Sequence, residues 1–498
     1  MEGMNTRPPH AVVIIGSGFG GLGMAYALRQ AGISDFVLLE KAHDLGGTWR
    51  ENTYPGAACD VPSHLYSFSF ERRYPWQHRY GKQAEILEYQ RFVANKYDLM
   101  RHIRFGVQVR AARFEADRAV WVVTLADGQS LEARTLISAV GQLHRPAIPD
   151  IPGLGDFQGR QFHSATWDAG YDFKGKRVAV IGTGASAVQF VPEIARQVAQ
   201  LHVFQRTPGW VAPKFDKRFS GFEHWLLKTF PWLYDLDRLR IYWLTEALAY
   251  AYQGHRWAER LITGMSKLQL RVQVRDPALR RKLTPDYPIG CKRILLTTDW
   301  LRALVRPNVE VVTDGVAAVT ANGVRTSEGR ERPVDAIVFG TGFAATQFLT
   351  PMTVTGLDGR DLHQTWTSGA EAYLGMAVSG FPNFFMLYGP NTNVGSGSII
   401  YMLECQQRYL VKLIQAAELR QWAAVDVRPE AQAAFSAEMQ QRSAETTFTG
   451  SCQSWYKTAE GRNTNNWVGL MREYRRRTEA PDLHAFRPVR VAETQSAP

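Results

Sequence analysis

Apolar runs, a glycine turn and helical periodicity follow one another near the start of this chain. His10–Ile15 is a mainly apolar run suited to a buried parallel strand, and the glycine-rich turn Gly16–Gly21 follows it. Leu22–Gln30 has apolar residues at helical spacing, and Asp35–Glu40 has the pattern of a second strand that ends in an acid. Strand, turn, helix and strand in this order predict a complete βαβ unit.

The same order returns in the middle of the chain. Lys176–Ile181 has the pattern of a strand, Gly182–Ala187 of a turn, Val188–Gln197 of a helix and Leu201–Gln205 of a second strand. Two such units in one chain predict an α/β fold with two Rossmann-like dinucleotide-binding domains.

Further strand patterns lie around these units. Ala119–Leu125 precedes a turn, and Leu136–Val140 runs directly into Gly141. Asp335–Phe339 ends in the same way, before Gly340-Thr341-Gly342. This repetition predicts that the chain leaves the first domain, builds the second and then returns to the first.

Domain boundaries follow from this arrangement. We expect the first domain to consist of residues 1–150 and 335–478, the second of residues 151–334, and a loosely docked tail to follow at 479–498. The α/β pattern is interrupted at about 213–285, which predicts a helical insertion in the second domain.

The insertion is rich in aromatic residues, and Pro231 is expected to divide it into separate helices. No part of it is free of charge for long enough to cross a bilayer. The pattern suits a helical cap packed on the core, with a large apolar pocket beneath, and it also suits a helix that rests on a membrane surface. The aromatic residues concerned are Trp225, Trp232, Tyr242, Trp243 and Trp257.

Composition and charge narrow the functional classes. The 498 residues are enough for two or three domains with cores of their own. A formal net charge of +11 fits simple solubility, anionic cofactors or anionic lipid. No nucleic-acid-binding module is visible, so nucleic acid is not an expected partner. The apolar run Ala11–Ile15 is too short for a signal peptide or a membrane span.

The four cysteines, Cys59, Cys291, Cys405 and Cys452, are scattered along the chain. No pair has CxxC or metal-ligand spacing, so we expect no disulfide scaffold, no metal site and no dithiol redox centre. This cysteine usage fits a reducing cytoplasm.

The first glycine turn has the spacing of a dinucleotide-binding loop. Gly16 permits the tight turn, Gly18 lets a pyrophosphate approach the backbone, and Gly21 lets helix and strand pack closely. The helix that follows offers free N–H groups and a positive dipole end to the phosphates. Glu40, at the end of the next strand, can accept hydrogen bonds from ribose hydroxyls.

The second glycine turn points to a different nucleotide. Gly182 and Gly184 keep the loop pattern, but the following strand ends at Arg206 and Thr207 in place of an acid. Arginine and a hydroxyl can hold a 2′-phosphate, so this site is predicted to prefer NADP. A solvated arginine at a strand end is the alternative interpretation.

Three further segments contain candidate chemistry. In Gly46-Gly47-Thr48-Trp49, the glycines let the backbone pass flat against a planar ligand on which Trp49 can pack. The stretch 157–168 is a linker with an aromatic residue at each end and His163 between, and a lone histidine there is more often structural. Lys292 and Arg293 suit a solvated basic spot, but a buried Arg293 would hold an oxyanion reliably.

Two of these segments resemble the motifs of the type I Baeyer–Villiger monooxygenases, which are class B flavoprotein monooxygenases. The pattern FxGxxxHxxxW[PD] is met without a gap by Phe157, Gly159, His163, Trp167 and Asp168. The pattern GGxWxxxxYPGxxxD is met by Gly46, Gly47, Trp49, Tyr54, Pro55, Gly56 and Asp60. Lys292-Arg293 is similar to the family's active-site pair, and the run from Phe381 to Asn391 also resembles it.

The resemblance implies an enzyme that uses FAD, NADPH and molecular oxygen. NADPH would reduce FAD, oxygen would add to give a C4a-peroxyflavin, and this species would convert a small apolar ketone into an ester or lactone. Arg293 would stabilise the peroxide anion, and Asp60 would orient Arg293. Arg206, Thr207 and Lys292 would hold the 2′-phosphate of NADP, and His163 would position the domains.

Further candidate contacts of the cofactors are Thr48, Tyr66, Val109, Thr183, Ser186 and Gly342. The last of these belongs to Gly340-Thr341-Gly342, where the family usually has Ala-Thr-Gly, and glycine can adopt the same backbone geometry.

Other functions remain open at this point. A flavin monooxygenase that oxygenates nitrogen or sulfur, or one that hydroxylates an apolar substrate, shares the two-nucleotide plan. A disulfide reductase would need a nearby cysteine pair. A flavin-binding scaffold without activity would be expected to lose Arg293 or Asp60, and both are present.

Overall fold

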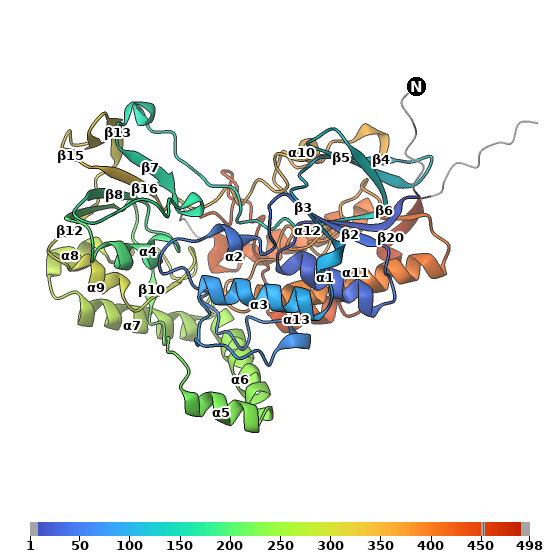
Figure 1. The fold of residues 1–498 in the computed structure, drawn as a ribbon, viewed down its shortest axis with the longest axis horizontal. Helices are drawn as coiled ribbons and strands as arrows, with labels where there is room; N and C mark the ends of the chain where they lie inside the picture. Colours follow the sequence, from blue (N-terminus) through green and yellow to red (C-terminus); the bar gives the residue numbers. More distant parts are fainter. Residues whose placement is uncertain (1–7, 450–451, 453, 490–498) are drawn as a thin grey trace, which may run out of the picture.

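The computed structural model of the protein describes residues 8–449, 452 and 454–489, and its described strands are dominated by two sheets (Figure 1). The first sheet has eight strands in the order β17-β4-β5-β6-β1-β2-β3, with β18 beside β6. Its strands are β1 (His10–Ile15), β2 (Phe36–Glu40), β3 (Ile103–Phe105), β4 (Val109–Glu115), β5 (Val120–Leu125), β6 (Ser130–Ser138), β17 (Thr353–Thr355) and β18 (Phe384–Met386).

The second sheet has five strands in the order β12-β9-β8-β16-β7, and all of its neighbours are parallel. Its strands are β7 (Arg160–His163), β8 (Arg177–Ile181), β9 (Gln200–Phe204), β12 (Val309–Val312) and β16 (Ala336–Phe339). Smaller sheets pair β10 (Val211–Ala212) with β11 (Leu295–Leu296), β13 (Val316–Thr320) and β15 (Glu331–Pro333) with β14 (Gly323–Thr326), and β19 (Ala424–Val427) with β20 (Phe486–Val489).

Helices cover these sheets and form the lower part of the molecule in Figure 1. They are α1 (Phe19–Gln30), α2 (Thr48–Glu51), α3 (Gln83–Lys96), α4 (Ala187–Ile194), α5 (Gly221–Thr229), α6 (Trp232–Ala249), α7 (Arg256–Gln273), α8 (Pro277–Lys282), α9 (Trp300–Leu304), α10 (Leu362–Thr365), α11 (Ile399–Leu419), α12 (Pro429–Ala444) and α13 (Met471–Arg477). Short 3-10 turns lie at Ser69–Glu71, Met100–His102, Leu154–Asp156, Ser164–Thr166, Leu357–Gly359, Thr447–Thr449 and Leu483–Ala485.

Alternation along β1 explains how the first sheet forms its core. Val12 and Ile14 face α1 and pack in one apolar cluster, while Val13 and Ile15 face the opposite side and pack in a second cluster with Trp121. A strand that is buried on both faces is typical of a parallel sheet covered on both sides. Both predicted βαβ units are therefore present, β1-α1-β2 in the first sheet and β8-α4-β9 in the second.

One predicted boundary is wrong. The strand at Asp335–Phe339 was expected to return to the first domain, but β16 lies between β7 and β8 in the second sheet. The return comes only after Gly342, whose carbonyl accepts a hydrogen bond from the Ala147 N–H at 2.9 Å. Because a strand that ends in glycine looks the same in either sheet, the pattern could not say which sheet it joins.

The predicted loose tail is also wrong over its first part. Residues 479–489 contain β20, which pairs in antiparallel fashion with β19. The Arg487 guanidinium lies 2.8 Å from the buried Asp426 carboxylate and fixes this strand. Residues 490–498 lie outside the described part of the chain.

The insertion is helical, with α5, α6, α7 and α8 between residues 221 and 282. Pro231 is the N-cap residue of α6 and separates it from α5. In Figure 1 α5 and α6 project from the lower edge of the molecule, and α7 lies along the same edge. Within the described residues, no helix is long and apolar enough to cross a membrane.

Candidate active site

A cavity of about 780 Å³ opens at the carboxyl end of the first sheet. The ends of β1, β2 and β6 contribute its walls. The part of the chain built around the first sheet is called the first unit, and the part built around the second sheet, with the helical insertion, is called the second unit. The loop before α4 and Gln189 on that helix close the cavity from the second unit. Ligands of open parallel sheets bind at this end of the strands, because the connections to the following helices diverge there. Both the size and the place suit a large cofactor.

The glycines of the first turn have distinct surroundings. Gly16 has a φ of +101°, and a Cβ atom there would lie 2.8 Å from the Ala139 carbonyl oxygen. A Cβ atom on Gly21 would lie 1.9 Å from the Gly16 carbonyl oxygen, so only glycine fits where α1 crosses the turn. Gly18 has no atom closer than 3.7 Å to such a Cβ position and lines the cavity. The turn is therefore tightly packed behind and open toward the cavity.

Glu40 fixes this turn from the next strand. Its Oε2 atom accepts hydrogen bonds from the Ser17 N–H at 2.9 Å and the Ser17 hydroxyl at 2.7 Å. Its Oε1 atom accepts one from the Ala42 N–H at 3.0 Å. These three donors hold the buried carboxylate at the cavity wall, where it has acceptor capacity left for a ligand.

An aromatic wall faces the same space. The Trp49 indole N–H donates to the Tyr66 hydroxyl at 3.0 Å, and both side chains line the cavity. The Thr48 hydroxyl donates to the Leu143 carbonyl at 3.3 Å, and Val109 lines the cavity at the start of β4. These four predicted residues are thus brought together by three separate segments of the first unit.

Arg293 and Asp60 meet at the wall of the cavity, although 232 residues lie between them in the sequence. The Arg293 guanidinium donates to Asp60 Oδ2, and the two side chains are 35% and 23% exposed. The Asp60 carboxylate raises the pKa of Arg293 further above its usual value, although burial opposes this shift. A fixed and permanently charged cation therefore faces the space beside the first turn.

The loop that contains Asp60 is fastened by the second unit. Gln189 on α4 accepts hydrogen bonds from the Tyr54 hydroxyl at 3.1 Å and the Ala58 N–H at 3.3 Å, and its amide donates to the Ala58 carbonyl at 2.8 Å. A Cβ atom on Gly56 would lie 2.6 Å from the Gln189 carbonyl oxygen. The position of Asp60 therefore depends on contact between the two units.

The motif at 157–168 lies outside the wall of the cavity. Trp167 packs against Phe190 on α4 at 5.3 Å and edge-on to Tyr54 at 6.5 Å between ring centroids. His163 is buried, its Nδ1 atom accepts from the Ala165 N–H at 3.1 Å, and burial lowers its pKa.

The remaining motif residues also make structural contacts. Asp168 accepts from the Arg160 guanidinium at 2.7 Å. Phe157 is buried, and a Cβ atom on Gly159 would lie 2.6 Å from the Asp335 carbonyl oxygen. The contact between Trp167 and Tyr54 crosses between the two units, whereas these contacts of Phe157, Gly159 and Asp168 lie within the second unit.

The second turn and its basic residues form a separate place beside the cavity. Gly182 has a φ of +103° and packs against the Gly340 carbonyl, and Ser186 lines the cavity. The predicted residues Thr183, Gly184, Arg206, Thr207, Lys292 and Gly342 are not part of the cavity wall.

Two cations lie close together at this second place. Burial lowers the pKa of Lys292, and the nearby positive charge of Arg206 lowers it further. The Lys292 ammonium also sits 5.0 Å from the centre of the Tyr287 ring. Because Arg206 is exposed and Lys292 is half-buried, a ligand of opposite charge can reach both.

The cysteines depart from the prediction. Cys291 and Cys452 are joined by a disulfide across a sequence separation of 161 residues. Pairing of such distant residues depends on the fold and leaves no spacing pattern in the sequence. Because two of the four cysteines form a disulfide, the cysteines no longer support the prediction of a reducing compartment. Cys59 and Cys405 are buried free thiols.

Several residues that line the cavity were not predicted from the sequence. They are Lys41, Arg110, His144, Arg145, Gln189, Tyr388, Asn393 and Tyr456. Burial, with help from the charges of Lys41 and Arg145, lowers the pKa of His144 to about 4. Lys41 directly follows a predicted strand end, and that signal could have identified it. Tyr388 lies within the run from Phe381 to Asn391 that resembles the family, so that signal could have identified it, whereas Tyr456 comes from a loop with no pattern of its own.

Comparisons with known proteins agree with this geometry. A family model described as flavin-binding monooxygenase-like matches residues 9–355. A Streptomyces coelicolor protein named Baeyer–Villiger monooxygenase is 45% identical over 486 residues, which are 97% of this chain and 93% of that protein.

Solved structures are similar over nearly the whole chain. An oxidised steroid monooxygenase bound to NADP has a TM-score of 0.86 and 31% identity, and the match covers 97% of this chain and 99% of that one. The structure of OTEMO in complex with FAD and NADP has a TM-score of 0.85 and 28% identity, and the match covers 97% and 100% of the two chains.

Proposed function

The chain belongs to the flavin-binding monooxygenase-like family, and from this premise we propose that it is a Baeyer–Villiger monooxygenase that uses FAD and NADPH. Its reaction inserts one atom of molecular oxygen beside the carbonyl of a small apolar ketone and gives an ester or a lactone. The main support is the Arg293 guanidinium, which Asp60 holds at the wall of the cavity that the first glycine turn also lines.

The residues of the cavity fit FAD. The open side of Gly18, at the N-terminus of α1, offers backbone N–H groups to a pyrophosphate. Glu40 is placed for ribose hydroxyls, and the wall of Trp49 and Tyr66 suits a flat ring system. When bound, FAD supplies acceptance of a hydride from NADPH and the subsequent activation of oxygen.

The role of Arg293 follows from its charge. Oxygen insertion beside a carbonyl develops negative charge on oxygen, and a cation in a water-poor cavity stabilises that charge strongly. Arg293 cannot give up its proton at neutral pH, because the Asp60 carboxylate raises its pKa further. Asp60 also holds the guanidinium in one direction, so little reorganisation is needed during the reaction.

The second unit is proposed to hold NADPH. Arg206 and Lys292 together would bind the 2′-phosphate, and Thr207 would add a hydroxyl donor. Arg206 lies near enough for its positive charge to lower the pKa of Lys292, and this proximity of the two cations supports a shared phosphate site. The turn at Gly182 and Gly184 would receive the pyrophosphate.

Oxygenation of a nitrogen or sulfur centre is the less supported alternative. That chemistry calls for a protonated oxidant, and a fixed guanidinium beside it favours the deprotonated form. The Arg293–Asp60 pair therefore supports the ketone reaction.

We propose the cytoplasm, where NADPH is supplied, as the place of action.

The test uses the purified, FAD-loaded enzyme, NADPH, a cyclic ketone and a thioether, with analysis of both products. In Arg293→Ala, ester formation should fall by about 100-fold or more while FAD stays bound. The matched control is Arg302→Ala, which removes an arginine that is 64% exposed on α9. Ester formation at the original rate in Arg293→Ala would contradict the proposed role.

A further inference from the structure

Large apolar side chains are exposed in one region of the protein. Of the 18 exposed large apolar side chains among the described residues, 14 lie between Phe215 and Val272. This region contains α5, α6 and α7, which form the lower edge in Figure 1. Scattered exposed apolar residues are normal, but a concentration of this kind marks a surface that binds something.

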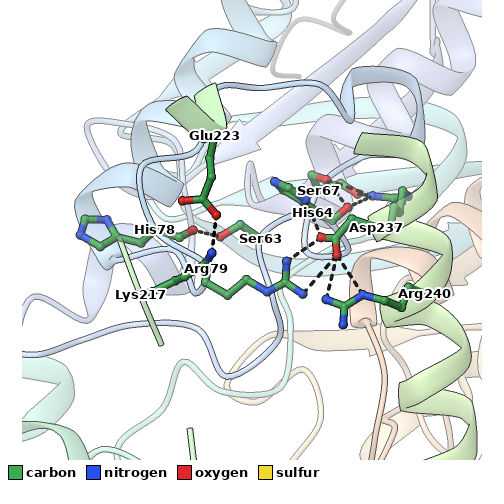
Figure 2. A network of polar contacts seen from close by, with 10 residues as sticks. Ser63, His64, Ser67, His78, Arg79, Lys217, Glu223, Asp237 and Arg240 are labelled. Atoms are coloured by element: carbon green, nitrogen blue, oxygen red, sulfur yellow. Dashed lines mark hydrogen bonds and ion pairs between the residues drawn. The ribbon is translucent and has the colours of Figure 1, made fainter. Parts of the chain in front are cut away.

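Helix α6 has its polar face turned inward. Figure 2 shows Asp237 on α6 pointing into the protein, where its carboxylate lies 2.5 Å from the Arg79 guanidinium and 2.8 Å from His64 Nδ1. Arg238 donates to the His64 carbonyl at 2.6 Å, and Asp235 pairs with Arg73 at 2.6 Å. Ion pairs therefore dock this helix on the body beside the buried side chains of Tyr234 and Ile241.

The outward face of α6 is correspondingly apolar. The outward stripe begins at Trp232 and continues four, seven and eleven residues later at Leu236, Leu239 and Trp243, a spacing that places all four side chains on one side of the helix. Each is at least half exposed, with Leu239 at 51% and Trp232 at 59%. Phe222 and Trp225 on α5 are also exposed and stack at 5.7 Å. An apolar stripe of this width is unfavourable in water unless another apolar phase covers it.

Helix α7 adds a second exposed stripe with a basic border. Trp257, Leu261, Leu268 and Val272 follow one side of the helix and are all exposed. A second line of exposed side chains consists of Arg260, Lys267 and Arg271. Within the described part of the chain, none of these three cations has an ion-pair partner, so their charge is available to an anionic surface.

We propose that this lipid-facing surface, formed by α5, α6 and α7, docks the protein on the surface of an anionic phospholipid bilayer. Tryptophan prefers the interface between lipid and water, and long basic side chains can reach headgroup phosphates from an apolar stripe. The helices lie on the surface and do not cross it, in agreement with the described helices, none of which could span a bilayer.

Charge favours lipid over a second copy of the chain. The protein has a net charge of +11, so two copies that meet through this surface would bring their unpaired Arg260, Lys267 and Arg271 side chains close to one another. An anionic headgroup layer instead complements these residues, and each basic residue near such a surface contributes about 1 kcal/mol.

The test is flotation of the FAD-loaded full-length protein with vesicles. One set consists of phosphatidylcholine with roughly one quarter phosphatidylglycerol, and the other of phosphatidylcholine alone. The wild type should float with the anionic vesicles, should bind less at high salt, and should show a blue shift of tryptophan fluorescence. NADPH oxidation and FAD content verify that every variant is folded.

Two pairs of variants separate the apolar and the electrostatic contributions. Leu239→Ser with Trp243→Ser should abolish flotation, whereas Leu419→Ser, which changes an 85% exposed leucine at the end of α11, should not. Arg260→Glu with Lys267→Glu should weaken binding by at least about 25-fold, because two contributions of about fivefold each are lost. The control Lys174→Glu with Lys176→Glu makes the same charge change away from the lipid-facing surface.

Either of two results would overturn the proposal. The first is a wild-type protein that stays unbound at low salt with anionic vesicles. The second is a lipid-free wild type that sediments as a dimer and becomes a monomer in Leu239→Ser with Trp243→Ser, without flotation of either protein. That result would assign the surface to contact between copies of the chain.

Discussion

Removal of Arg206 tests how the second unit distinguishes NADPH from NADH. Arg206 lies two residues after the end of β9 and is exposed, and its charge contributes to the lowered pKa of the half-buried Lys292. Arg206→Ala removes one of the two cations proposed to meet the 2′-phosphate. NADH lacks that phosphate, so its binding should hardly change.

The expected magnitude follows from the contacts that would be lost. A hydrogen bond to a charged group contributes about 1.5–3 kcal/mol, and each 1.4 kcal/mol is tenfold. Arg206→Ala should therefore lower kcat/KM for NADPH by about 10-fold to 100-fold and leave kcat/KM for NADH nearly unchanged. Because the nearby positive charge is gone, the pKa of Lys292 should rise, so Lys292 stays charged and preserves a residual preference for NADPH.

The assay is steady-state oxidation of each nucleotide by the FAD-loaded enzyme. Arg196→Ala is the matched control, since Arg196 is exposed just after α4 and pairs with Glu193 at 3.3 Å. An Arg206→Ala enzyme whose preference for NADPH over NADH equals that of the wild type would refute the assignment.

Three other predictions follow from the same structure. Gly21→Ala should abolish retention of FAD, because the new Cβ atom would lie 1.9 Å from the Gly16 carbonyl oxygen. The control Gly155→Ala, whose Cβ atom would meet no atom within 4 Å, should bind FAD normally. The absorbance of protein-bound flavin measures both variants. Cys452→Ser should lower the free energy of unfolding by about 2–4 kcal/mol in urea, and addition of a dithiol to the wild type should have the same effect; equal stability with and without the dithiol would contradict this. A hydrogen bond from Arg332 lowers the pKa of Glu310 to about 2, so the stabilisation of the fold by this carboxylate is complete above about pH 4.5 and is lost as the pH falls toward 2. Glu310→Gln should lower the free energy of unfolding by about 1–2 kcal/mol at pH 7. It should also remove the dependence of that free energy on pH between these two pH values.

Local pattern was sufficient for the nucleotide-binding units. The strands β1 and β8 and the glycine turns behind them were predicted within about one residue, because an apolar run before a glycine turn is decided by neighbours in the sequence. The same reasoning predicted the strand that forms β16 but assigned it to the wrong sheet, and it did not predict β20. Their partners are β7, β8 and β19, and no short-range signal says which sheet a strand will join.

The candidate site divides in the same way. Gly16, Glu40 and Trp49 belong to continuous motifs, and all three line the cavity. Gln189, Tyr388 and Tyr456 also line it. Gln189 closely follows the second glycine turn and Tyr388 lies within the run from Phe381 to Asn391, but all three reach the cavity only through tertiary packing. The pairing of Cys291 with Cys452 was missed for the same reason.

The exposed apolar stripe of α6 shows that the spacing of apolar residues along a helix does not decide which face is buried. Tryptophan and leucine at helical spacing predict an amphipathic helix, and the ordinary expectation is that the apolar stripe faces the core. Here Asp237 pairs with Arg79 and His64, Arg238 donates to the His64 carbonyl, and Asp235 pairs with Arg73, so polar partners on the first unit decide which face of the helix turns inward. The sequence of the helix alone is compatible with either orientation.

Contact between the two units links the nucleotide sites to the oxygen chemistry. Asp60 belongs to a loop of the first unit, whereas Arg293 follows the helical insertion of the second, so their ion pair exists only when the units are correctly joined. Gln189 and Trp167 make the contacts that join them at this point. A change at Gln189 should therefore weaken oxygen insertion without removing either nucleotide-binding turn, since it would release the loop that positions Asp60 and leave both glycine turns intact.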